Sequence, residues 1–152
     1  MNRIRPYVLV VDDLHDAADS MALLLALWGY DAEARYCGLS ALEAVRIRRP
    51  AAVLLDIGMA PMDGFAFAAQ LRELPGCERT TIVAVSGFTS KAYQARGREM
   101  GIDHYLFKPA DPSLVRTLLG RLIPEPTLTR SGAGHRRRNG QRLAELAGSR
   151  LS

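Results

Sequence analysis

Reactive polar side chains follow four of the apolar segments that the sequence predicts as strands. The pair Asp12-Asp13 follows the first segment, Asp56 the third, Ser86 the fourth and Lys108 the fifth. In an open parallel sheet, the carboxyl ends of the strands share one edge, and ligands bind there. We therefore expect three carboxylates, one hydroxyl and one amine to lie together at that edge.

Such a group of side chains is suited to phosphoryl transfer. Neighbouring carboxylates repel one another unless a cation compensates them, and hard oxygen ligands at a partly open site favour Mg²⁺. An aspartate can attack phosphorus to form an acyl phosphate, while a metal ion and an ammonium neutralise the phosphoryl oxygens. Taken singly, each residue has an ordinary structural role, because aspartate and serine form turns and lysine is usually a surface charge. Their shared position favours the functional interpretation.

Strand and helix patterns alternate strictly along the chain. Short apolar or β-branched runs predict strands, and apolar residues at helical spacing, closed by glycine or proline, predict helices. Asp111 is expected to cap the last helix, with Pro112 at its first position. The alternation favours a parallel sheet with helices on both faces. The expected strands are residues 7–11, 31–36 (at an edge), 51–55, 81–85 and 104–107, and the expected helices are residues 16–28, 39–48, 65–74, 90–100 and 111–123.

The composition fits one domain with its own core. The chain has 152 residues, of which 48% are hydrophobic and 24% charged, which argues against a disordered or fibrous protein. The apolar run at residues 21–28 is far shorter than the roughly 18 residues of a membrane helix, and no signal peptide is evident. We expect a cytoplasmic protein with no membrane contact. Cys37 and Cys77 are too few for a disulfide framework or a four-ligand zinc site.

The positive charge is confined to the end of the chain. The formal net charge is +4, but seven arginines and two glutamates give residues 121–152 a charge of +5, so residues 1–120 carry −1. Residues 126–140 are rich in Thr, Ser, Gly and Arg, a composition typical of disorder. We expect one domain at residues 5–123 and a basic, disordered tail at residues 124–152.

With these motifs the sequence resembles the receiver domains of two-component response regulators. The resemblance covers about residues 5–123 and rests on Asp-Asp after the first strand, a lone Asp after the third, Ser after the fourth and Lys-Pro after the fifth. Residues 56–64 and 101–112 look most like receivers attached to hybrid sensor histidine kinases. The resemblance implies an α/β, flavodoxin-like, doubly wound sheet of five parallel strands in the order 2-1-3-4-5, with helices on both faces.

The resemblance also implies a phosphorylation site and a metal site. Asp56 would accept a phosphoryl group from the phosphohistidine of a sensor histidine kinase or a histidine phosphotransfer protein. Asp13, Asp56 and the backbone carbonyl of Gly58 would bind Mg²⁺, with Asp12 acting directly or through water.

Other residues would contact the phosphoryl group or respond to it. Ser86 and Lys108 would complete the catalytic set with Asp56, and the Lys108–Pro109 peptide bond would be cis. Tyr105 matches the aromatic switch position, where the ring turns inward as Ser86 moves toward the phosphate. A half-buried aromatic residue on the last strand is the alternative interpretation of Tyr105.

Gly58 argues against one alternative function. A Mg²⁺-dependent phosphohydrolase with an aspartate nucleophile is that alternative, but haloacid-dehalogenase-like phosphatases carry a second aspartate two residues after the nucleophile, where this chain has Gly58. Gly58 and Phe88 also occupy positions that influence dephosphorylation in receiver domains, so the sequence does not predict the phosphoryl lifetime. A nucleotide-binding enzyme is disfavoured because no glycine-rich phosphate loop follows the first strand.

The main hypothesis is therefore a signalling module and not an enzyme. Phosphorylation would shift a two-state equilibrium and repack the face between the fourth strand and the fifth helix for a downstream protein that the sequence does not identify. The regulator would be a single domain without an output domain, and either a monomer or a phosphorylation-dependent dimer.

The run Arg136-Arg137-Arg138 raises the alternative of a weak nucleic-acid-binding regulator. An arginine-rich segment binds polyanions without sequence specificity. Only 29 residues follow Ile123, too few for the helix-turn-helix domains of larger regulators. Specific DNA binding is therefore not expected, and a solvated tail is the favoured interpretation.

Overall fold

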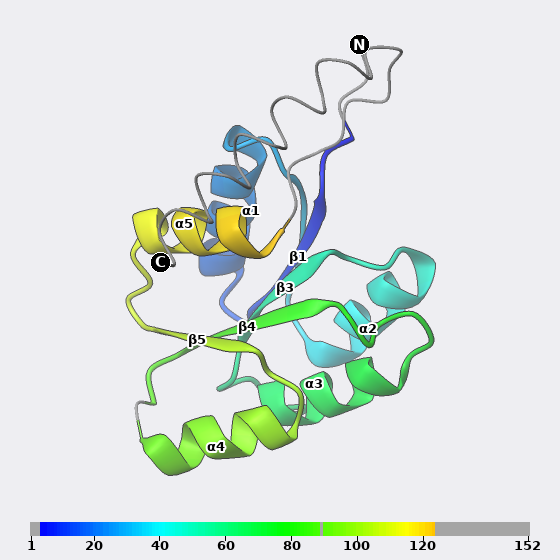
Figure 1. The fold of residues 1–152 in the computed structure, drawn as a ribbon, viewed down its shortest axis with the longest axis vertical. Coiled ribbons are helices and arrows are strands. Elements are labelled where there is room, and N and C mark those ends of the chain that lie inside the picture. The colour runs from blue at the N-terminus through cyan, green and yellow to red at the C-terminus, as the bar shows by residue number, and fades with distance from the viewer. Residues whose placement is uncertain (1–3, 89, 124–152) are drawn as a thin grey trace, which may run out of the picture. The chain divides into compact units, whose positions relative to one another are not determined.

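The computed structural model describes residues 4–88 and 90–123, and in them strands alternate with helices as expected (Figure 1). The bounds differ from the expected ones by no more than one residue at either end. The strands are β1 (Tyr7–Val11), β2 (Asp31–Arg35), β3 (Ala52–Asp56), β4 (Thr81–Ser86) and β5 (His104–Phe107), and the helices are α1 (His15–Leu27), α2 (Gly38–Ile47), α3 (Gly64–Glu73), α4 (Lys91–Glu99) and α5 (Pro112–Leu122).

The five strands form one parallel sheet in the order β2-β1-β3-β4-β5. This confirms the predicted flavodoxin-like order and the edge position of β2. The chain runs outward in one direction from β1 to β2 and in the other from β3 to β5, so the order reverses between β1 and β3. Ligands of open α/β sheets bind at such a reversal, beyond the carboxyl ends of the strands.

Two hydrophobic cores, one on each face of the sheet, hold the helices in place. Helices α1 and α5 cover one face, and α2, α3 and α4 cover the other (Figure 1). Because side chains alternate along a strand, Leu9 and Val11 of β1 enter the core under α2 and α3, while Val8 and Val10 enter the core under α1 and α5. All residues of β1 and β3 are buried, which fixes the strands whose ends carry the aspartates.

Aspartate side chains cap the N-termini of α3 and α5, one helix on each face of the sheet. Asp63 caps α3, because its Oδ1 accepts a hydrogen bond of 2.8 Å from the Ala66 N–H. Asp111 caps α5 through the Ser113 N–H at 2.8 Å, and Pro112 opens that helix, as the sequence predicted.

Parts of the predicted organisation lie outside the described residues. The basic tail at residues 124–152, with Arg136-Arg137-Arg138, is among them, so the domain limits and the predicted disorder stay predictions. Among the described residues, no helix has both the length and the apolar character needed to cross a bilayer.

Arg72 of α3 joins the loop before β4 to the loop before β5, at the end of the sheet opposite the aspartates. Its Nη1 donates to the carbonyls of Cys77 (2.9 Å) and Thr80 (2.6 Å), and its Nη2 donates to the Gly101 carbonyl (2.7 Å). Nη2 also pairs with Asp103 Oδ2 at 2.9 Å, and that oxygen accepts from the Ile82 N–H at the start of β4. Most of the Arg72 side chain is covered, so these carbonyls have little access to water.

Replacing Arg72 by Met should destabilise the fold, because the carbonyls that it satisfies would lose their donors. We expect the free energy of unfolding to fall by about 2–4 kcal/mol, measured by urea denaturation. Arg79→Met, at an exposed position of the loop before β4, is the matched control and should change stability by less than about 0.5 kcal/mol. Equal stability of the two variants would mean that the Arg72 contacts contribute nothing.

Candidate functional site

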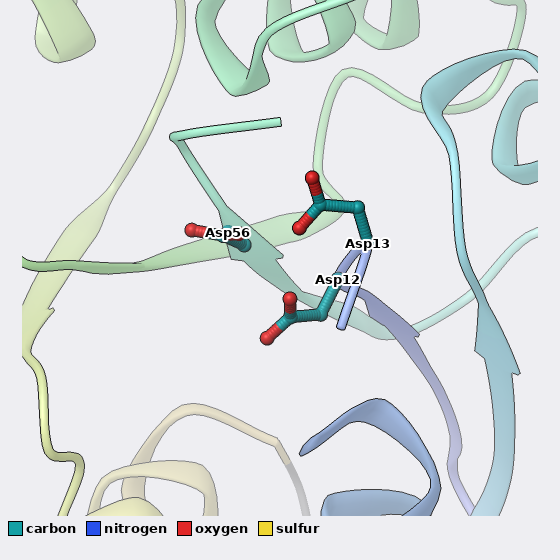
Figure 2. A group of neighbouring side chains, drawn as sticks. All are labelled: Asp12, Asp13 and Asp56. Atoms are coloured by element: carbon teal, nitrogen blue, oxygen red, sulfur yellow. The ribbon is translucent and has the colours of Figure 1, made fainter. Parts of the chain in front are cut away.

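Three carboxylates meet at the carboxyl edge of the sheet. Asp12 and Asp13 directly follow β1, and Asp56 is the last residue of β3 (Figure 2). One carboxylate oxygen from each lies within 4.8 Å of the others. The proximity follows from the strand register, in which Val11 pairs with Leu55, so Asp12 and Asp56 continue neighbouring strands at the same level.

Lys108 joins this cluster from the other side. Its Nζ lies 3.2 Å from Asp56 Oδ1 and 3.8 Å from Asp12 Oδ2. The backbone places it there, because the Lys108 N–H donates to the Ser86 carbonyl at 2.9 Å and extends the pairing of β4 with β5. The peptide bond Lys108–Pro109 is cis, as predicted, and Ala60–Pro61 is a second cis bond that the sequence did not predict.

Burial makes the carboxylates depend on a compensating charge. The Asp56 side chain is 9% exposed and that of Asp12 is 13% exposed. Burial raises the pKa of Asp12 above its usual value, and the neighbouring charge of Asp56 acts in the same direction. The Leu14 N–H, which donates to Asp12 at 3.0 Å, and the Lys108 ammonium lower the Asp12 pKa and offset part of this rise. One lysine thus compensates two buried carboxylates only partly.

The donor set fits a hard divalent cation. Three carboxylates offer oxygen ligands within a single small space, and Asp13 is exposed, so the site is open enough for water ligands. These are the ligands and the partial openness that Mg²⁺ favours. The Gly58 N–H donates to Asp56 Oδ1 at 3.2 Å, which keeps the backbone of Gly58 beside the carboxylate. The predicted metal role of the Gly58 carbonyl stays a prediction.

Ser86 lies at the same edge, but its hydroxyl is engaged elsewhere. Asp56 pairs with Val85 in the register of β3 and β4, so Ser86 is one residue beyond that level. The side chain is buried, and its Oγ accepts a hydrogen bond of 3.1 Å from the Phe88 N–H. This contact uses an acceptor site of the hydroxyl oxygen, so the Ser86 O–H stays able to donate to a phosphoryl oxygen.

Tyr105 is half-buried against α4. Its hydroxyl donates to the Tyr93 carbonyl at 3.3 Å, and burial raises its pKa. The ring lies over Gly97, where an added Cβ would come within 1.6 Å of the Tyr105 hydroxyl oxygen. The position is compatible with the predicted switch role, which stays a prediction.

Sequence reasoning missed two residues that position Tyr105. Gly97 is the buried residue of α4, and Tyr93 contacts Phe65 and Phe88 with ring centroids 4.8 Å apart in each pair. A glycine inside a helical pattern weakens the helix and often marks a close approach. That signal was present eight residues before Tyr105 in the sequence.

A sequence model of the response regulator receiver domain matches residues 8–119. Among curated proteins, the DNA-binding response regulator MtrA of Mycobacterium tuberculosis is 35% identical over 130 residues, which are 83% of this chain and 56% of MtrA. The transcriptional regulatory protein PrrA of the same organism is 35% identical over 104 residues, 68% of this chain and 44% of PrrA. The chain therefore spans about half the length of the curated relatives that it matches.

Solved structures show the same fold. Chemotaxis protein CheY4 of Vibrio cholerae has a TM-score of 0.76 and 27% identity, covering 79% of this chain and 100% of that one. A CheY-like receiver domain from Methylobacillus flagellatus has a TM-score of 0.69 and 32% identity, covering 78% of this chain and 99% of that one.

Replacing Asp12 by Asn tests the repulsion between the carboxylates. Asn keeps an oxygen for the Leu14 N–H but removes one charge. Because the pKa of Asp12 is raised in the fold, the stability that this group contributes is present below the pKa of the unfolded chain and is lost as the pH rises through the folded pKa. At pH 7 without divalent ions, we expect Asp12→Asn to raise Tm by about 2–5 °C.

Scanning calorimetry with and without Mg²⁺ measures this change. Mg²⁺ should raise the Tm of the unchanged protein clearly and that of Asp12→Asn much less, and the gain from Asp12→Asn should shrink as the pH falls toward about 4. Asp16→Asn, an exposed residue in the first turn of α1, is the matched control. A lower Tm for Asp12→Asn at pH 7 would contradict the repulsion inferred from the structure.

Replacing Gly97 by Ala tests whether the Tyr105 ring packs against Gly97. At an exposed helical position the change would stabilise the protein by about 0.8–1 kcal/mol. Over the Tyr105 hydroxyl it should instead destabilise by about 1–3 kcal/mol, because the ring must leave its place. In a double-mutant cycle by urea denaturation, Tyr105→Val should remove this penalty. Stabilisation by Gly97→Ala in the unchanged background would show that the Tyr105 ring does not pack against Gly97.

Proposed function

The chain belongs to the response regulator receiver domain family, and from this premise we propose that Asp56 accepts a phosphoryl group from the phosphohistidine of a sensor histidine kinase or histidine phosphotransfer protein. The observation that supports this most directly is the buried Asp56 carboxylate with the Lys108 ammonium at 3.2 Å. A receiver domain with this site would act as a signalling module and not as an enzyme.

Asp12, Asp13 and Asp56 would hold Mg²⁺ in this proposal, together with the Gly58 carbonyl. The support is the donor set itself, three carboxylate oxygens within 4.8 Å of one another beside a buried and only partly compensated charge. The metal ion would supply neutralisation of charge on the transferring phosphoryl oxygens.

Three residues of this chain would act directly on the phosphoryl group. An Asp56 oxygen attacks phosphorus, the phosphorus–nitrogen bond of the phosphohistidine breaks, and the imidazole nitrogen keeps the bonding electron pair. The Lys108 ammonium moves with the negative charge from the Asp56 carboxylate to the phosphoryl oxygens. The Ser86 hydroxyl, whose oxygen accepts from the Phe88 N–H at 3.1 Å, donates its hydrogen to a phosphoryl oxygen and moves toward that group.

Movement of Ser86 toward the phosphoryl group, passed to the following loop through the Phe88 N–H contact, would be the signal that leaves the site. Phe88 packs on Tyr93 of α4, and the Tyr93 carbonyl accepts from Tyr105, so the loop after β4, α4 and β5 form one connected group. We propose that phosphorylation shifts the equilibrium between two arrangements of this group, presenting a changed face to a downstream protein or to a second copy of the chain. A cytoplasmic location agrees with this role.

We propose no nucleic-acid binding by the described residues. The matched relatives include a protein named as DNA-binding and one named as transcriptional, but in each the match covers about half of the protein. The arginine run at residues 136–138, which raises the alternative of nucleic-acid binding, lies outside the described residues. The expectation that the chain does not bind specific DNA stays a prediction.

The proposal is tested by chemical phosphorylation. Incubation with acetyl phosphate and Mg²⁺ should add the mass of one phosphoryl group to the intact protein, and Asp56→Asn should lose at least about 90% of that signal because the nucleophile is absent. Mass spectrometry of the whole protein measures both.

Asp63→Asn is the matched control, because Asp63 follows the same strand and caps α3 instead of facing Lys108. It should label like the unchanged protein. Equal labelling of Asp56→Asn and the unchanged protein, or no labelling with Mg²⁺ present, would refute Asp56 as the acceptor.

A further inference from the structure

An apolar cavity of about 490 Å³ opens beside the three charged residues of the site. One end of its wall is polar and is formed by Asp12, Asp56 and Lys108. The rest is almost wholly apolar and comes from three parts of the fold, the strand ends, the start of α1 and the loop after β5. The apolar lining residues are Val10, Val11, Leu14, Ala17, Met21, Leu54, Leu55, Val85, Pro109 and Ala110.

Small side chains leave this space open. Ala17 of α1 and Ala110, in the loop between β5 and α5, contribute only methyl groups to the lining. The floor is rigid, because Val10 and Leu54 are 4% and 2% exposed and belong to the core under α1 and α5. A cavity with a firm apolar floor and a few polar groups at one end is the usual form of a small-molecule site.

The charges at the polar end select the ligand. The Lys108 ammonium attracts an anionic head, and its nearest partner, Asp56, is the proposed phosphoryl acceptor. An occupant that matches both ends has a phosphoryl group at Lys108 and an aliphatic body along Ala17, Met21 and Leu54. A phosphoryl donor of this kind that needs no protein is an acyl phosphate with a carbon chain longer than acetyl.

We propose that the cavity binds the carbon chain of medium-chain acyl phosphates, so that these molecules phosphorylate Asp56 more efficiently than acetyl phosphate. The inference rests on the proposed function of Asp56. An Asp56 oxygen attacks phosphorus, the bond between phosphorus and the acyl oxygen breaks, and the fatty carboxylate leaves with the electron pair. No other reactant is needed.

Burial of the chain sets the size of the effect. Each methylene that leaves water contributes about a fourfold increase in kcat/KM when it is fully buried. The increase should continue until the cavity is filled and then stop. A donor whose chain stays in water would show no dependence on length.

The experiment compares acetyl, butyryl and hexanoyl phosphate with Mg²⁺, using the initial rate of mass-detected labelling of the full chain. For the unchanged protein we expect kcat/KM to rise by at least about tenfold from acetyl to hexanoyl phosphate. Ala17→Leu fills the cavity from α1, and Ala110→Leu fills it from the loop after β5. In each, the ratio of hexanoyl to acetyl labelling should fall to near one, so the test does not depend on one variant folding.

Ala26→Leu adds the same side chain to an exposed position of α1 away from the cavity and should keep the ratio of the unchanged protein. Labelling by acetyl phosphate without any rise along the series would overturn the inference and leave the proposed function standing. A rise that persists in both filled variants would overturn it as well. Failure of all donors to label would instead refute Asp56 as the acceptor, and the inference would fall with it.

Discussion

The contact between Lys108 and Asp56 is the interaction on which the site depends. A carboxylate that is almost fully covered is costly unless an opposite charge lies close, and here the ammonium lies 3.2 Å away. The distance is set by strands far apart in the sequence, since Asp56 ends β3 and Lys108 follows β5, with β4 between them. The charge of Asp12 is only partly compensated, and exposed Asp13 adds a third carboxylate, a donor set that fits a divalent cation. The sheet order, the strand lengths and the two cores all act to hold these charges at one level.

The polar contacts around the site are of two kinds. At the end of the sheet away from the aspartates, Arg72 donates to several carbonyls of the loops before β4 and β5. Those near the carboxylates leave room for exchange, because the Ser86 hydroxyl holds only a loop amide and Asp13 is exposed. This division suits a signalling domain, because the contacts of Arg72 can maintain the fold while the side chains at the carboxyl edge change partners.

The elements and the site edge could be predicted from the sequence because their determinants are local. Glycines and prolines end the helices, and the buried strands are apolar runs closed by Asp12 or Asp56, so bounds were correct to within one residue. Three features could not be predicted in the same way: the packing of Tyr105 against Gly97, the loop contacts of Arg72 and the cavity beside Lys108. Each joins residues from separate elements, and their side chains carry no pattern that marks the partner. The strand order itself came from the family resemblance, since alternation alone does not fix it.

Helix α4 is held to the sheet by little fully buried apolar surface. Among the helices described, α1, α2, α3 and α5 each bury apolar side chains completely, while the buried residue of α4 is Gly97, which has none. Half-buried Tyr93 and Met100 supply its main apolar packing. Displacing α4 therefore exposes little buried hydrocarbon to water, and we expect its local opening to cost less free energy than that of the other described helices. The described helix with the least buried hydrocarbon therefore lies beside the residues that would sense the phosphoryl group.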